Sequence, residues 1–135
     1  MTTLADLAPS VQAFRPFLPA KDFQTSLRFY ETLGFHSFRL GEALAELRLG
    51  PNAFLLQGDY VKEWAENCVM HVLVEDIDAW WRVISALELE KSFDVPPPHP
   101  PKAEDWGLTV FYLTDPTGIL WHFAAETDEQ PLRQP

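Results

Sequence analysis

The segment Asp115-Pro116-Thr117-Gly118 constrains the fold more than any other part of the chain, because its composition is that of a tight turn. Proline presets φ at the second position, aspartate bonds back to the backbone, and glycine relieves the exit from the turn. Apolar runs flank the turn on both sides, at residues 108–113 and 119–123. The pattern therefore predicts a β-hairpin.

The second strand of this hairpin carries His122, a titratable ring on a rigid element. Side chains alternate between the two faces of a strand, so His122 shares a face with Leu120 and Ala124. Trp121 and Phe123 point to the opposite face. A histidine in this position serves as a hydrogen-bond donor, acceptor or base for a small molecule. The alternative is a half-buried histidine satisfied by a backbone carbonyl.

Composition predicts a single globular domain and excludes several partners. The chain has 135 residues, of which 47% are hydrophobic and 22% charged. Its net charge of −10 argues against nucleic acid and anionic membranes as partners, since both attract clustered Lys and Arg. Cys68 is the single cysteine, so no disulfide framework is expected. The sequence shows no membrane-length apolar run and no secretory signal, which makes a cytoplasmic location the default expectation.

Hydrophobic periodicity and turn residues predict the order of the elements. We expect a strand at 13–20, a helix near 22–33, strands at 35–40, 43–49 and 52–57, a loop with one helical turn at 58–67, a strand at 68–74, a helix near 76–88, a short strand at 91–95, an extended proline-rich segment from 96, and the hairpin.

This order contains an approximate internal repeat of about fifty residues. Asp22 and Asp76 each follow a strand end and cap an apolar first helical turn. We therefore expect a loose leader at 1–12 and one domain at 13–126, built of modules at 13–57 and 68–125. A frayed tail is expected at 127–135.

Three segments resemble the vicinal oxygen chelate superfamily, also called the glyoxalase, bleomycin-resistance and dioxygenase superfamily. They are the strand and helix at 14–35, the second strand-to-helix junction at 70–81, and the hairpin at 115–123. The resemblance implies an α+β fold of two βαβββ modules, whose curled sheets form a cleft within one chain or across a homodimer. Many members bind a divalent metal, whereas the bleomycin-resistance type holds a drug without one.

The resemblance also implies where metal ligands would fall in this chain. The positions are Arg15, Val69, His122 and a fourth near Leu56 or Gln57. A guanidinium repels a divalent ion, and a valine has no lone pair to offer. We therefore predict no metal and no other cofactor.

A divalent metal at a shifted site remains the alternative. His71 follows Val69 by two residues and lies on the same face of its strand. Such a site would use His71, His122 and Gln57, which is a poor donor set without a carboxylate or thiolate.

The leading hypothesis is a metal-independent protein that binds a planar or amphipathic small molecule in an aromatic cleft. Arg15 would anchor an anionic group, although a pair with an acidic side chain explains it equally well. Aromatic side chains in loops are better candidates for contacting a planar ligand than those on helices. The candidate binding residues are Arg15, Phe17, Gln57, Tyr60, Trp64, His71, Trp106, Phe111 and His122.

Two enzymatic alternatives stay open at this point. One is a metal-dependent lyase, isomerase or ring-cleaving dioxygenase, in which the ion acts as a Lewis acid. The other is a metal-free enzyme in which His122 is the general base.

Overall fold

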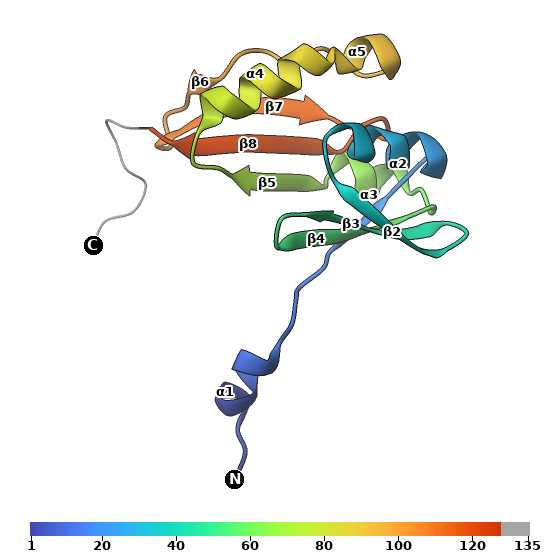
Figure 1. Ribbon diagram of the computed structural model, residues 1–135, viewed down its shortest axis with the longest axis vertical. Helices are drawn as coiled ribbons and strands as arrows, with labels where there is room; N and C mark the ends of the chain where they lie inside the picture. The colour runs from blue at the N-terminus through green and yellow to red at the C-terminus, as the bar shows by residue number, and fades with distance from the viewer. Residues whose placement is uncertain (128–135) are drawn as a thin grey trace.

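A computed structural model describes residues 1–127, which form two four-stranded sheets (Figure 1). The first sheet has the order β1-β4-β3-β2 and contains β1 (Phe17–Pro19), β2 (His36–Gly41), β3 (Leu44–Leu49) and β4 (Asn52–Gln57). The second has the order β5-β8-β7-β6 and contains β5 (Val69–Leu73), β6 (Lys102–Ala103), β7 (Leu108–Thr114) and β8 (Leu120–Glu126). In each sheet the first strand pairs in parallel with the last one, as two βαβββ modules require.

Helices lie before the first strand and in several of the connections between strands. They are α1 (Leu4–Leu7), the 3-10 turn η1 (Ala8–Ser10), α2 (Phe23–Thr32), α3 (Lys62–Glu66), α4 (Ile77–Leu87) and α5 (Leu89–Ser92). Figure 1 shows α4 lying across one face of the second sheet, with α2 close to the place where the two sheets meet. Among residues 1–127, every helix is too short or too polar to cross a bilayer.

The two long helices start at the capping residues that the sequence indicates. The Asp22 carboxylate accepts the amide hydrogen of Thr25 at 3.1 Å, and Asp76 accepts that of Ala79 at 3.0 Å. Such caps satisfy backbone donors that the first helical turn leaves free. Gly34 ends the first helical run with φ at +97°, a conformation that glycine adopts without strain.

Two expected strands differ from the structure. The first strand is confined to Phe17–Pro19, because Pro16 and Pro19 have no amide hydrogen for a ladder. The prediction of a strand at 91–95 is wrong. Glu88 adopts a left-handed conformation with φ at +51°, and the chain turns into α5, which is anchored by the buried side chain of Leu89. The corresponding strand is β6, beyond the prolines.

The expected leader is more ordered than predicted, and it stands away from the sheets (Figure 1). Thr3 and Asp6 form a reciprocal capping box around α1. All side chains from Met1 to Phe17 are exposed in the single chain. The expected tail lies outside the described residues except for Thr127, whose amide donates to Gly107 O at 3.1 Å.

The hairpin turn is confirmed, and a buried carboxylate closes it. Asp115 is 2% exposed, and its Oδ1 accepts the amide hydrogens of Thr117, Gly118 and Ile119, each at 2.9 Å. The Thr117 hydroxyl oxygen in turn accepts the amide hydrogen of Lys21, at 3.0 Å. The turn of the second module is therefore docked against the start of the helix of the first.

The second oxygen of Asp115 extends this link to the middle of α2. It accepts the Tyr30 hydroxyl hydrogen at 2.5 Å, and Trp121 Nε1 donates to the same hydroxyl at 3.0 Å. Burial raises the pKa of Asp115, against the opposing effect of the hydrogen bonds that it accepts. Burial and the neighbouring carboxylate also raise the pKa of Tyr30 well above its ordinary value.

Four aromatic rings form the core at this junction. Tyr30, Phe35, Phe54 and Trp121 pack so that every pair of ring centroids lies between 5.0 and 5.8 Å apart. They come from α2, the residue before β2, β4 and β8, so both modules contribute. Edge-to-face contacts of this kind stabilise beyond the burial of their area.

We predict that Tyr30→Phe lowers the free energy of unfolding by about 2 kcal/mol, because the substitution leaves buried hydrogen-bonding groups of Asp115 and Trp121 unpaired. Urea unfolding followed by tryptophan fluorescence measures the change. Tyr60→Phe is the matched control, since Tyr60 is 38% exposed. Equal midpoints for the two variants would contradict the role of the Tyr30 hydroxyl.

Candidate functional site

The candidate site is the outer face of the second sheet, meaning the face turned away from the aromatic core. His71 on β5 and Tyr112 on β7 are both register partners of His122 on β8, so the three side chains lie in one row. Ring centroids lie 5.6 Å apart for His71 and His122, and 5.0 Å apart for Tyr112 and His122. Trp106, which precedes β7, adds a fourth ring at 6.1 Å from His122.

Apolar side chains border this row and are open to solvent in the single chain. Val69 is 51% exposed and Leu73 is 48% exposed, one on either side of His71 along β5. Trp106 and Tyr112 are 44% and 38% exposed. Contiguous exposed apolar side chains are common on surfaces that contact a ligand or another protein.

The surroundings of His122 favour its neutral form over its protonated form. Burial lowers the pKa of His122, and the positive charge that His71 can carry lowers it further. Among the described residues, neither imidazole has a side-chain or backbone hydrogen-bond partner. Both rings are therefore free to bond a ligand, and neither is held in one tautomer.

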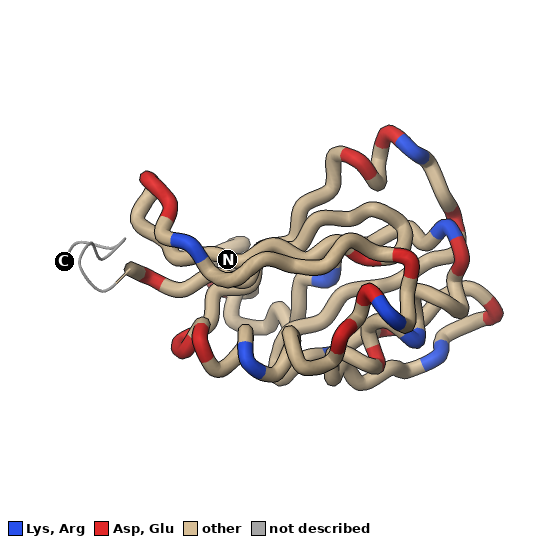
Figure 2. Tube along the Cα trace, turned by 90° about the horizontal axis from the view of Figure 1, so that it is seen from above, with Lys and Arg blue, Asp and Glu red and all other residues tan. Residues whose placement is uncertain are grey.

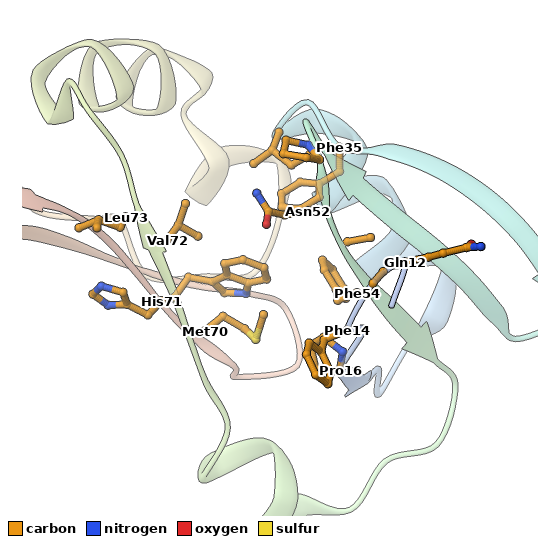
Figure 3. Close-up of a pocket in the computed structure, with 15 residues that line it drawn as sticks. Gln12, Phe14, Pro16, Phe35, Asn52, Phe54, Met70, His71, Val72 and Leu73 are labelled. Carbon is orange, nitrogen blue, oxygen red and sulfur yellow. The ribbon is translucent and has the colours of Figure 1, made fainter. Parts of the chain in front are cut away.

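A pocket of about 560 Å³ lies beside this face, between the two modules (Figure 3). Residues of β5 line one side, and the β3–β4 turn with Phe54 lines the other. The lining includes His71 and Leu73 from the outer face of β5 and Met70 and Val72 from its opposite face, so the pocket lies along the edge of the second sheet. Gln12, Phe14 and Pro16 bring the segment before β1 to its rim.

The proline-rich segment forms a second hollow, of about 470 Å³, against the outer face of β7. Pro96 to Pro98, His99 and Pro100 lie opposite Val110 and Tyr112. The segment therefore borders the ring row at Tyr112. The sequence does not indicate a role for the proline-rich segment, and the structure places it beside the candidate site.

The first sheet carries the other predicted residues on its own outer face. Phe17 pairs in register with Leu55, and Gln57 lies two positions further along β4. Arg15 Nη1 donates to the Glu46 carboxylate at 2.6 Å. Phe17 and Arg15 are exposed, and Gln57 is half-buried.

Three predicted binding residues lie elsewhere. Phe111 pairs in register with Phe123, stacks on it at 5.1 Å, and is 1% exposed in the core under α4, so its assignment to the binding face is wrong. Tyr60 lies under the Lys21 ammonium, 5.6 Å from ring centroid to Nζ. Trp64 is half-buried on α3. Neither lines the pocket between the modules.

Acidic and basic residues are distributed singly or in small groups along the Cα trace (Figure 2). No long basic stripe of the kind that tracks a phosphate backbone is drawn among residues 1–127.

The family profile of the Glyoxalase/Bleomycin resistance protein/Dioxygenase superfamily matches residues 11–123, which is most of the chain. The chain belongs to this superfamily. Among curated superfamily members, a bleomycin resistance protein from Klebsiella pneumoniae is 28% identical over 115 residues, covering 78% of this chain and 85% of the relative.

Several solved structures share the fold of this chain. A bleomycin-binding protein complexed with bleomycin has a TM-score of 0.72 at 24% identity, covering 87% of this chain and 100% of that one. The bleomycin-binding protein of Streptomyces verticillus, complexed with copper(II)-bleomycin, has a TM-score of 0.68 at 23% identity, covering 87% and 98%. Lactoylglutathione lyase from Agrobacterium tumefaciens has a TM-score of 0.61 at 18% identity, covering 85% and 94%. The predicted α+β fold with two curled-sheet modules is thus confirmed.

The superfamily's metal positions do not fit a divalent ion in this chain. Arg15 is already bonded to Glu46, and Val69 has no donor atom. At the ambiguous fourth position Leu56 is fully buried, so Gln57 is the residue that reaches the outer face. Within residues 1–127, no group of three or more His, Cys, Asp or Glu side chains converges as a metal site. The alternative set is also divided, since Gln57 lies on the first sheet and both histidines on the second.

Sequence reasoning missed Tyr112, Glu46 and Arg48. Counting residues through the turn would have found Tyr112, because the register that pairs Phe111 with Phe123 places Tyr112 beside His122. Arg48 lies two residues after Glu46 on the same strand, so side-chain alternation could have paired them. Arg15, the second partner of Glu46, is known only from the folded chain.

We predict that the His122 imidazole titrates below the ordinary histidine range in an NMR pH titration. His71→Gln removes the neighbouring charge and raises this midpoint, although burial still holds it low. Because folding lowers the pKa, His122 contributes stability above about pH 6.5, and this contribution is lost as the pH falls. His99→Gln, in the proline segment, is the control that leaves the midpoint unchanged. A His122 midpoint at or above the ordinary value would contradict the described burial.

Proposed function

We propose that this protein binds a planar or amphipathic organic molecule on the outer face of its second sheet, without a metal ion and without chemical change to the ligand. One observation carries the proposal. The ring centroids of His71, Tyr112 and Trp106 lie within about 6 Å of the His122 ring centroid. The surface that these rings form is exposed to solvent in the single chain.

The chemistry of this face favours binding over catalysis. A general base is normally held in place by a hydrogen bond to its second ring nitrogen, and the described residues offer His122 no such partner. Aromatic rings with two free imidazoles supply flat apolar contact and a few polar points, the composition typical of ligand pockets. The metal-dependent alternative remains an outcome of the experiment below. Substrate turnover by the metal-free protein that is lost in His122→Ala would support the alternative in which His122 is the base.

The relatives support the same class of ligand. The Klebsiella pneumoniae relative is a bleomycin resistance protein, and two solved structures of similar fold hold bleomycin or copper(II)-bleomycin. We propose a ligand of comparable amphipathic character for this chain.

We further propose that the protein is a homodimer and that a second copy closes the cleft. Apolar side chains remain exposed on the outer faces of both sheets and along the segment before β1. Leu4 is 87% exposed, Phe14 is 91% exposed and Phe38 is 50% exposed. A segment that carries such residues and stands away from its own sheets is suited to contact another copy (Figure 1). The cytoplasmic location and the absence of a nucleic-acid partner stay predictions.

We predict that the neutral fluorophore phenylnaphthylamine binds in the presence of a chelator, and that Trp106→Ala weakens it about tenfold, as expected for loss of an aromatic anchor. Fluorescence titration measures both affinities. Val83→Ala truncates an apolar residue that is 65% exposed on α4 and serves as the control. Absence of binding would refute the proposed function. Affinity that disappears with chelator would support the metal-dependent alternative.

We predict a dimer for the full chain in light scattering, with about twice the 15.4 kDa chain mass. Phe14→Asp is expected to shift the protein towards monomer, because it places a charge in the proposed interface. Val83→Asp adds the same charge to the far side of α4 and should leave the dimer intact. A monomeric wild type would refute the shared cleft.

A further inference from the structure

The outer face of the first sheet holds a charge cluster that the ligand proposal does not yet use. Glu46 on β3 is the register partner of both Phe38 on β2 and Leu55 on β4. Leu55 is in turn the partner of Phe17 on β1. These four side chains therefore form one row across the sheet, with the carboxylate inside an apolar row.

Two guanidinium groups share this carboxylate. Arg15 Nη1 donates to Glu46 Oε2 at 2.6 Å, and Arg48 Nη2 donates to Oε1 at 2.8 Å. Glu46 is only 6% exposed, whereas the side chains of Arg15 and Arg48 are 44% and 52% exposed. The hydrogen bond from Arg15 is the largest of the effects that lower the pKa of Glu46, which keeps it ionised.

The balance of charge in the cluster is positive. Two arginines and one carboxylate leave a net charge of +1, in a chain whose total is −10. Each guanidinium has five N–H donors, and each places a single nitrogen on Glu46. The pairing compensates the burial of the Glu46 carboxylate, which would be costly for an unpaired charge. Its structural effect is to hold two partly free guanidiniums side by side.

From this geometry we infer that Arg15 and Arg48, positioned by Glu46, bind the anionic group of an amphipathic ligand, such as a carboxylate, sulfonate or phosphate. The inference rests on the proposed function and on the proposed dimer, in which the first sheet of one copy would face the second sheet of the other, because the arginines and the row of rings lie on different sheets. It specifies the class of the ligand. Phe38 lies beneath the Arg48 guanidinium at 5.4 Å from the ring centroid, and Phe17 is 45% exposed nearby in the same row. The anion site is therefore bordered by apolar surface that suits the body of such a molecule.

Two matched fluorophores test the inference. Anilinonaphthalene sulfonate carries an anionic group, and phenylnaphthylamine has a similar aromatic body without one. We expect Arg15→Gln and Arg48→Gln each to weaken the sulfonate about fivefold, a modest loss because both side chains are half exposed. Phenylnaphthylamine should bind both variants as it binds the wild type.

Arg28→Gln on the exposed side of α2 is the charge-matched control and should alter neither affinity. Arg15→Lys keeps the charge and provides a second variant if Arg15→Gln fails to fold, which circular dichroism reports. We expect it to bind the sulfonate more weakly than the wild type, because the planar fork is lost.

The outcomes separate the two proposals. If both probes bind and the arginine variants hold the sulfonate as tightly as Arg28→Gln does, the anion site is refuted and the aromatic cleft stands. If phenylnaphthylamine itself fails to bind, the proposed function is refuted and the anion site falls with it.

Discussion

The buried carboxylate of Asp115 is the contact on which the rest of the structure depends. One oxygen closes the turn that leads into β8, and the other accepts the hydroxyl hydrogen of Tyr30 on α2. Both modules therefore share one polar group. Burying a carboxylate is costly unless all its lone pairs are used, so this arrangement tolerates little displacement of either partner. The position of β8, and with it the direction of His122, is fixed relative to the first module.

Strand β8 connects the core to the candidate site because its side chains alternate. Trp121 and Phe123 are buried against the core and α4, while His122 between them reaches the outer face. The packed rings behind the strand give the site a rigid support, which lowers the cost of ordering when a ligand binds. The apolar groups left open on this outer face, such as Val69, then have no partner in the single chain.

At one place on the surface, the local charge has the opposite sign to the net charge of the chain. The chain is strongly acidic, yet Arg15 and Arg48 present a locally positive surface held by the buried Glu46. A position at which related proteins can hold a metal ligand is here occupied by a cation. The proposed anion site would therefore use directional N–H donors and aromatic contact rather than the Lewis acidity of a bound ion.

The sequence by itself determined the elements whose signals are local. Asp22 and Asp76 cap their helices within three residues, and the turn at 115–118 needs only its own side chains, so the starts of both helices and the hairpin could be predicted. Only the tertiary structure decided the contacts between distant residues. Tyr30 reaches Asp115 across 85 positions, and Arg15 reaches Glu46 across 31, because such partners are chosen by packing and register rather than by spacing along the chain.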